Sequence, residues 1–159
     1  ISCNFSNATL SYCKFSESTF NSCNLSLVKL KGSVFNDVDF KECKLVGIDF
    51  SVAELPFAIN AYSSNLDMCS FYDLDMRHAD LIGCHMHNVD FAKTNLEKAN
   101  FKESDLSHAI FEQSNLQKCD FSQAFHYQID PTQNSVKGTK ISIQEARSFL
   151  AFFALDIVD

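Results

Sequence analysis

The sequence is short of the residues that interrupt regular structure. Its 159 residues include four glycines, two prolines and no tryptophan, so we expect most of the chain to be regular rather than looped. No apolar run approaches the roughly 18 residues of a membrane span, and no signal-peptide pattern opens the chain. Basic residues are scarce as well, with 13 against 20 acidic residues and a net charge of −7. These absences argue against a loop-rich protein, a membrane protein and a basic nucleic-acid-binding protein.

Phenylalanine and cysteine are abundant instead, with 16 and 7 copies. Phenylalanine or leucine recurs at every fifth position from Phe5 to Leu55, and after a slip of one residue the spacing resumes from Leu66 to Phe121, with methionine at two places. The residue two places before each of these centres is Ala, Ser, Thr, Cys or Val in nearly every repeat. The residue between the two is often Asn or Asp. An internal repeat with a period of five residues therefore covers most of the chain.

A period of five matches neither the α-helix, with 3.6 residues per turn, nor the β-strand, with a repeat of 2.0. It divides into a step of two, which in extended chain returns a side chain to the same face, and a step of three, which must contain a corner. Such a chain winds around an axis and points one small and one large side chain inward from each side. Because stacked coils satisfy one another's backbone hydrogen bonds, the repeat predicts a solenoid with a filled core.

The succession of a small residue, Asn or Asp, and Leu or Phe resembles the pentapeptide-repeat family over about residues 1–124. The resemblance implies an all-β fold, a right-handed quadrilateral β-helix in which four repeats form one coil. We therefore expect a β-helix over residues 1–125 and a C-terminal turn, connector and capping helix over 126–159. The phase slip within residues 56–65 predicts an insertion that one coil tolerates; an irregularity that contacts a partner is the alternative.

All seven cysteines occupy the small inward position of the repeat. A metal site or a ladder of disulfides is one interpretation. Against it, the sequence has no CxxC, other small residues alternate with Cys at the same position, and an odd number leaves one sulfur over. We favour Cys as a small core residue in a reducing compartment, which predicts a cytoplasmic location.

After the last repeat, the Asp-Pro pair at 130–131 predicts a turn and residues 136–141 a last short strand or connector. Ser142 and Glu145 have the spacing of a capping box, so a helix is expected to start there. This helix should cover the open end of the solenoid, and its surplus apolar surface predicts a homodimer contact. The residues expected to form that contact are Phe149, Leu150, Phe152, Phe153 and Ile157.

No catalytic or cofactor motif is present, whether a GxSxG, a P-loop, a glycine-rich dinucleotide loop or an HExxH. Because a filled core leaves no concave pocket, we expect neither an enzyme nor a cofactor. His85 and His87 flank the inward Met86, and His108 is expected further along the same face. A surface metal site is one interpretation of these histidines. We favour solvated histidines and no metal, because no outward carboxylate or cysteine is evident there to complete the ligand set.

Acidic residues concentrate in the middle of the chain. Residues 37–130 hold sixteen acidic and seven basic side chains, whereas residues 1–36 hold one and three. Direct binding to nucleic acid is therefore disfavoured, and an acidic rod suits a protein with a basic groove instead. We expect the outward charge to be carried by Asp73, Asp75, Asp80, Asp90, Asp105 and Asp120.

The Asp-Pro turn followed by an apolar terminal helix resembles the Qnr quinolone-resistance branch of the family. That resemblance implies a dimeric DNA mimic that binds DNA gyrase or topoisomerase IV. A general protein-interaction scaffold with an unrelated partner is the alternative, and acidic residues scattered evenly over the four faces would favour it.

Overall fold

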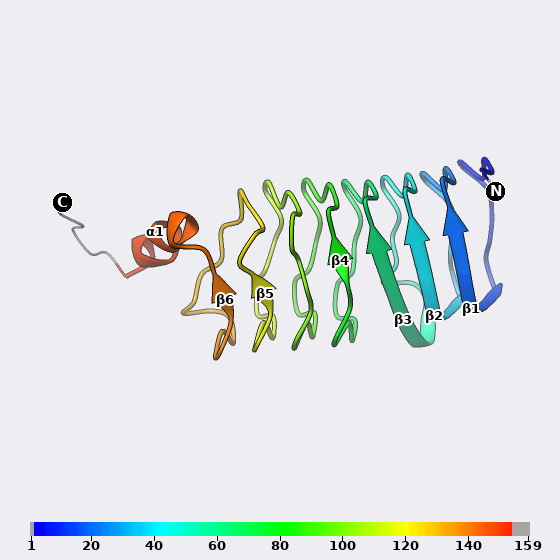
Figure 1. The fold of residues 1–159 in the computed structure, drawn as a ribbon. Helices are drawn as coiled ribbons and strands as arrows, with labels where there is room; N and C mark the ends of the chain where they lie inside the picture. Colours follow the sequence, from blue (N-terminus) through cyan, green and yellow to red (C-terminus); the bar gives the residue numbers. More distant parts are fainter. Residues whose placement is uncertain (1, 154–159) are drawn as a thin grey trace.

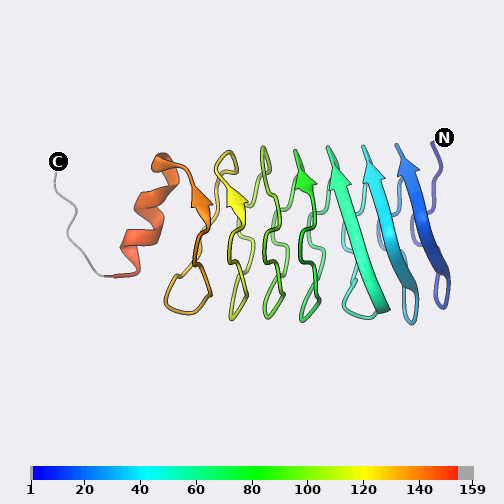
Figure 2. The ribbon, with the colours of Figure 1, turned by 60° about the horizontal axis from the view of Figure 1, so that its bottom comes forward.

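The chain forms a straight rod of stacked coils with a helix at one end (Figure 1). This computed structural model describes residues 2–153. The N-terminal coil lies at one end of the rod and helix α1 at the other, and a view turned by 60° shows the same stack of coils along the whole length (Figure 2). The β-helix predicted from the five-residue repeat is confirmed.

Every strand in the described part of the chain pairs in parallel with a strand of a neighbouring coil. One sheet joins β1, β2, β3 and β4 in that order, and a second joins β5 and β6. Between these strands, single bridges link residues twenty apart, such as Asn95 with Asn115. The strand bounds are β1 (Lys14–Asn21), β2 (Val34–Lys41), β3 (Glu54–Tyr62), β4 (Leu81–Ile82), β5 (Asp120–Phe121) and β6 (Lys140–Ile141).

The corners of the coils are made by left-handed residues. The residue two places after a centre has a positive φ at nearly every repeat, for example 56° at Asn88 and 59° at Lys93. This conformation costs a non-glycine residue about 1–2 kcal/mol. Most amide groups of these corners donate to the next coil: Asn88 N–H donates to Ser107 O at 3.0 Å and Lys93 N–H to Glu112 O at 2.7 Å. Hydrogen bonds between coils thus hold the corners in place.

The core is a set of stacked phenylalanine columns. Phe71, Phe91 and Phe111 lie one above the other with ring centroids 5.3 Å apart at each step, and Phe101 stacks on Phe121 at 4.6 Å. Rings in neighbouring columns meet edge to face, as Phe91 and Phe101 do at 5.7 Å. Offset stacking and edge-to-face contact are the arrangements that the aromatic quadrupole favours. The abundance of Phe is therefore explained by the core.

The small inward position supplies hydrogen bonds as well as space. A Ser, Thr or Cys at this position donates its hydroxyl or thiol hydrogen to a backbone carbonyl in the previous coil. In most coils this carbonyl belongs to the centre residue 23 positions earlier. A carbonyl oxygen accepts two hydrogen bonds, and a typical one contributes about 0.5–1.5 kcal/mol to stability. Examples are Thr94 to Phe71 at 2.8 Å, Ser104 to Leu81 at 2.7 Å, Ser114 to Phe91 at 2.7 Å and Cys119 to Leu96 at 2.8 Å.

The packing interpretation of the cysteines is confirmed for five of the seven, whereas Cys3 is exposed and Cys13 is half-buried. All seven are thiols rather than disulfides, and five of them are buried. Burial raises the pKa of the Cys69, Cys84 and Cys119 thiols to about 12, so these side chains stay protonated and unreactive at neutral pH. Each thiol also donates to a carbonyl, a role that Cys shares with Ser and Thr at this position and that Ala and Val do not have.

The phase slip is confirmed as an irregular coil, but the prediction that Leu55 points inward is wrong. Leu55 is 75% exposed, and Phe57 takes the core position. Phe57 pairs with Phe35 in the register of β2 and β3, and packs against Phe50 with ring centroids 5.9 Å apart. Two extra residues therefore loop out before Phe57, and the step from Phe57 to Ile59 is one residue shorter than usual. In the sequence, these two changes together are visible only as a shift of one residue in the repeat.

Helix α1 (Ile143–Ala151) closes the C-terminal end of the rod (Figure 1). Its predicted start is confirmed, because Ser142 caps it by accepting the Glu145 N–H at 3.2 Å. Phe149 is the buried residue of the helix and meets Tyr127 edge to face at 6.3 Å, and Tyr127 covers Phe121 at 5.2 Å. Among residues 2–153, no helix has the length and apolar character to cross a membrane.

Candidate functional site

The six aspartates predicted to form an acidic surface differ in how far their charge is neutralised. Three of them have cationic partners: Asp75 with Arg77 at 2.7 Å, Asp105 with His87 at 3.0 Å, and Asp120 with Lys140 at 3.2 Å. Within residues 2–153, the other three take part in no ion pair. Asp73 is exposed, and Asp80 and Asp90 are half-buried.

These aspartates also lie on more than one face of the rod. Asp80 and Asp120 share a column, since both bridge to Asn100 from neighbouring coils. Asp90 bridges to Ser70 and Ile110, and Asp75 bridges to Asn95 in a third column. Asp105 bridges to His85 in the fourth column. The acidic character therefore surrounds the later coils instead of forming one patch.

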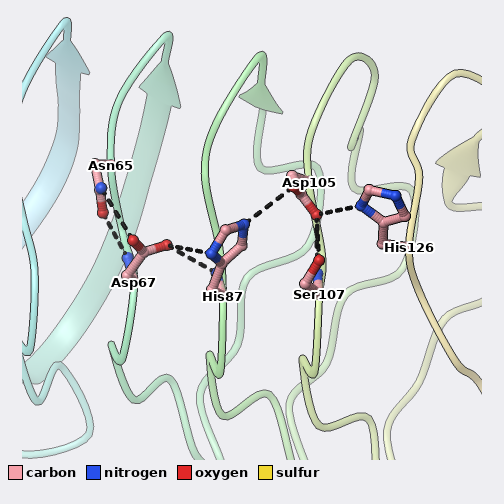
Figure 3. Close-up of polar contacts among 6 residues, drawn as sticks. All are labelled: Asn65, Asp67, His87, Asp105, Ser107 and His126. Atoms are coloured by element: carbon pink, nitrogen blue, oxygen red, sulfur yellow. Dashed lines mark hydrogen bonds and ion pairs between the residues drawn. The ribbon is translucent and has the colours of Figure 1, made fainter.

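A ladder of polar side chains runs across successive coils, on the face of the rod that includes the fourth column (Figure 3). His87 is placed between two carboxylates: its Nε2 lies 3.0 Å from Asp105 Oδ2, and its Nδ1 lies 3.9 Å from Asp67 Oδ1. Asp67 also accepts the His87 backbone N–H at 2.9 Å and is held from the other side by Asn65 Nδ2 at 3.0 Å. We call the residues drawn in Figure 3 the His–Asp ladder; they are Asn65, Asp67, His87, Asp105, Ser107 and His126.

Asp105 is the most strongly held member of the His–Asp ladder. Its Oδ1 accepts the Ser107 N–H at 3.1 Å and the Ser107 hydroxyl at 2.7 Å, and lies 3.1 Å from His126 Nδ1. Partial burial alone would raise the pKa of Asp105, but the contacts with Ser107, His87 and His126 outweigh it and hold this pKa well below its usual range. Contact with Asp105 in turn raises the pKa of His87, although partial desolvation opposes it. The two groups favour the ionised carboxylate and the imidazolium.

The argument against a metal at the histidines is contradicted by this geometry. It required that no outward carboxylate lie near His85 and His87. Asp105 does lie there, because it stacks directly on His85 in the next coil. One ligand atom from each of His85, His87 and Asp105 lies within 4.8 Å of the others, so these are the described residues that are able to hold a metal ion.

Two open grooves interrupt the surface, so the expectation of no concavity is wrong. The first, of about 810 Å³, lies beside the looped-out Leu55 and Pro56 and is bordered by Arg77. The second, of about 760 Å³, lies between the last coils and α1, and is lined by Glu112 and Phe152 among others. The core is filled as predicted. The grooves occur where the chain departs from the repeat, which a regular pattern does not reveal.

The predicted dimer residues fall into two groups. Phe149 faces the rod and is 9% exposed. Leu150, Phe152 and Phe153 are 39%, 43% and 52% exposed, so they present apolar surface at the end of the rod. Ile157 lies outside the described residues.

Sequence reasoning missed most of the His–Asp ladder. Asp67 and Ser107 attract no attention in a five-residue reading, because each occupies a variable position, and His126 marks only the place where the next centre is missing. Writing the chain in rows of one coil would have placed Asp67, His87 and Ser107 in one vertical column, since they are twenty residues apart. The alignment of these side chains is visible at a spacing of twenty residues, the length of one coil, and not at the five-residue spacing of the repeat.

The stacked square coils and the single terminal helix define a right-handed β-solenoid of about six turns. The chain belongs to the pentapeptide-repeat family. A family model described as a pentapeptide repeat region matches residues 1–58, and one described as pentapeptide repeats in eight copies matches 69–107 and 84–123. No curated protein matches the sequence significantly.

Solved structures of QnrB1, a plasmid-mediated fluoroquinolone resistance protein, share this fold. One trypsin-treated form has a TM-score of 0.64 at 16% identity, covering 99% of this chain and 87% of QnrB1. The full-length form has a TM-score of 0.54 at 19% identity, covering 96% and 86%. At these identities the likeness establishes the fold.

Proposed function

We propose that this chain is a non-enzymatic interaction protein that binds DNA gyrase or topoisomerase IV in the cytoplasm by mimicking DNA. The observation that carries the proposal is the likeness to QnrB1, which extends over nearly the whole chain and includes the C-terminal helix. A fold by itself does not determine function, so the proposal also depends on the charge and on the rod's end.

The charge of the later coils supports this partner. Asp73, Asp80 and Asp90 present carboxylates that no cation within residues 2–153 pairs with. A topoisomerase holds DNA in a basic groove, and carboxylates on a narrow rod are the complementary charge. Residues 64–125 carry a net charge of −5, from ten acidic and five basic residues.

The exposed apolar residues of the helix support a homodimer. Leu150, Phe152 and Phe153 lie at the end of the rod, where a second copy of the chain would extend it. Joining two rods end to end would double the length of the acidic surface. We expect sedimentation to give about twice the 17.9 kDa of the single chain, and Phe153→Asp to return the protein to a monomer because it places a charge in the apolar contact.

A general interaction scaffold with an unrelated partner is the second candidate, and one observation favours it. The six aspartates are distributed over the four columns of the rod, and half of them are already paired with a cation. A DNA mimic needs its charges aligned along one or two faces, whereas a scaffold places no such demand on them.

The proposal is tested by a supercoiling assay with purified gyrase, run with and without a fluoroquinolone. We expect the chain to bind the enzyme and either to inhibit supercoiling or to restore it in the presence of the drug. The same assay with topoisomerase IV measures decatenation. Absence of binding, inhibition and protection with both enzymes would contradict the proposal and favour the scaffold.

A further inference from the structure

His85, His87 and Asp105 converge from two adjacent coils at the centre of the His–Asp ladder. His85 and His87 leave the same coil on either side of the buried Met86. Asp105 stands on His85 in the next coil, and the Met86 N–H donates to Asp105 O at 2.8 Å. Backbone hydrogen bonds between coils therefore fix the spacing of the three side chains, as a preorganised site requires.

The separation of the ligand atoms suits a small divalent ion. With zinc-to-ligand distances of about 2.0–2.2 Å, two ligands of a tetrahedral site are about 3.3 Å apart. His87 Nε2 and Asp105 Oδ2 are 3.0 Å apart, and one ligand atom from each of His85, His87 and Asp105 lies within 4.8 Å of the other two. A rotation of the solvent-facing His85 side chain is enough to bring its ligand atom to the same separation from the other two.

In the described part of the chain, one of these atoms contacts no polar group other than Asp105. His87 Nε2 is buried and makes no aligned hydrogen bond, although it lies near Asp105. Its other nitrogen, Nδ1, faces Asp67. Around a bound zinc ion the second nitrogen of a histidine ligand usually donates to a carboxylate, which orients the ring and increases its basicity. Asp67 Oδ1, at 3.9 Å, would accept such a bond after a small shift of the ring.

The carboxylate ligand is oriented as well. Ser107 holds Oδ1 of Asp105 through its amide and its hydroxyl, which leaves Oδ2 directed at His87 (Figure 3). His126 contacts the same Oδ1. With neutral imidazoles the site has two negative charges, from Asp67 and Asp105, and a divalent cation would neutralise them.

From this geometry we propose that His85, His87 and Asp105 bind a divalent late transition-metal ion, with Zn²⁺ as the preferred ion. Two imidazoles and one carboxylate suit zinc, cobalt and nickel, whereas calcium and magnesium prefer oxygen ligands alone. This site is independent of the topoisomerase proposal, since it depends on other residues and on no partner.

Calorimetric titration of the purified full chain with Zn²⁺ tests the proposal, and Co²⁺ provides a spectroscopic copy of the site. We expect one ion per chain, a rise in thermal stability on binding, and the visible absorption of Co²⁺ bound by nitrogen and oxygen. His85→Ala, His87→Ala and Asp105→Asn should each weaken binding by at least about tenfold, and Asp67→Asn by about 10–100-fold through loss of orientation.

His78→Ala is the matched control, because His78 is an exposed histidine in a different column. It should leave the affinity unchanged, and circular dichroism of each variant should show that the β-helix is intact. Wild-type affinity in both His85→Ala and His87→Ala would overturn the proposal, as would the absence of binding. A thiolate-to-cobalt absorption would also overturn it, since it would assign the ion to the cysteines.

Discussion

The core follows one five-residue rule along the rod, but the outer surface differs between its two halves. We call the coils up to the end of β3 the early coils and those from residue 64 to residue 125 the later coils. Both place a small residue and a large apolar residue inward in each repeat. The early coils contain the long strands β1, β2 and β3, whereas the later coils are joined mostly by single bridges (Figure 2). All five histidines and all six aspartates expected to form the acidic surface occur after residue 72.

The difference shows how a solenoid separates stability from function. The five-residue rule constrains only the inward positions, so the outward ones vary without disturbing the stack. Ions, charges and grooves are therefore free to collect on particular coils. In this chain the six aspartates and the histidines other than His126 lie on the later coils, and the grooves lie at the two departures from the repeat, beside Leu55 and beside α1.

The largest expected effect comes from removing a ring from the centre of the stack. Phe91 is fully buried between Phe71 and Phe111, so Phe91→Ala should lower the free energy of unfolding by about 3–5 kcal/mol. Phe15 belongs to the first complete coil, is half-buried and stacks on Phe35. Phe15→Ala should cost less than about half as much. Urea unfolding followed by circular dichroism measures both.

Hydrogen exchange on the same pair of variants sharpens the comparison. Because each coil contacts only its neighbours, Phe91→Ala should speed exchange in the coils on both sides, whereas Phe15→Ala should affect the first coils alone. Equal losses of stability, with exchange spread evenly along the rod, would show that the coils unfold as one unit without distinct ends.

A smaller effect is expected from the hydroxyl at the small inward position. Ser104 donates to Leu81 O at 2.7 Å and accepts the Cys84 N–H at 2.9 Å, so Ser104→Ala leaves two buried groups unpaired and should cost about 1–3 kcal/mol. Ser18 in the early coils donates only to Ser16 O of its own strand, at 2.8 Å. Ser18→Ala should change stability by less than about 0.5 kcal/mol.

Ser104→Cys is the control for this prediction. Cys84 and Cys119 make the same kind of bond to a carbonyl from the same position, so the thiol should restore most of the stability that Ala removes. If the Ser104→Ala and Ser104→Cys variants were equally stable, the small inward position would contribute to stability through side-chain volume alone.

Most of the fold was predictable from the sequence because the inward positions repeat without exception outside one coil. The start of α1 was predictable too, because a capping box is a local signal. The inward residue of the irregular coil was not: Leu55 and Phe57 are both apolar, and a two-residue insertion followed by a shortened step looks like a single slip.

The candidate site was predictable only in part. The histidines were visible in the sequence, but the contact of His87 with Asp105 joins residues eighteen positions apart in different coils. The choice among outward neighbours depends on side-chain rotamers, which a backbone repeat does not determine. The grooves depend on how irregular segments pack, and no period describes them.

The central claim is that the carboxylates of the later coils recognise a topoisomerase. Its most direct test is the affinity for gyrase of two triple variants that each remove three negative charges. One is Asp73→Asn, Asp80→Asn and Asp90→Asn in the later coils; the other is Glu17→Gln, Asp37→Asn and Glu42→Gln in the early coils. We expect the first variant to bind at least about tenfold more weakly than the unmodified chain, a loss of about 1.4 kcal/mol, and the second to bind almost as well. Equal losses in both variants, or a larger loss in the second, would contradict the claim.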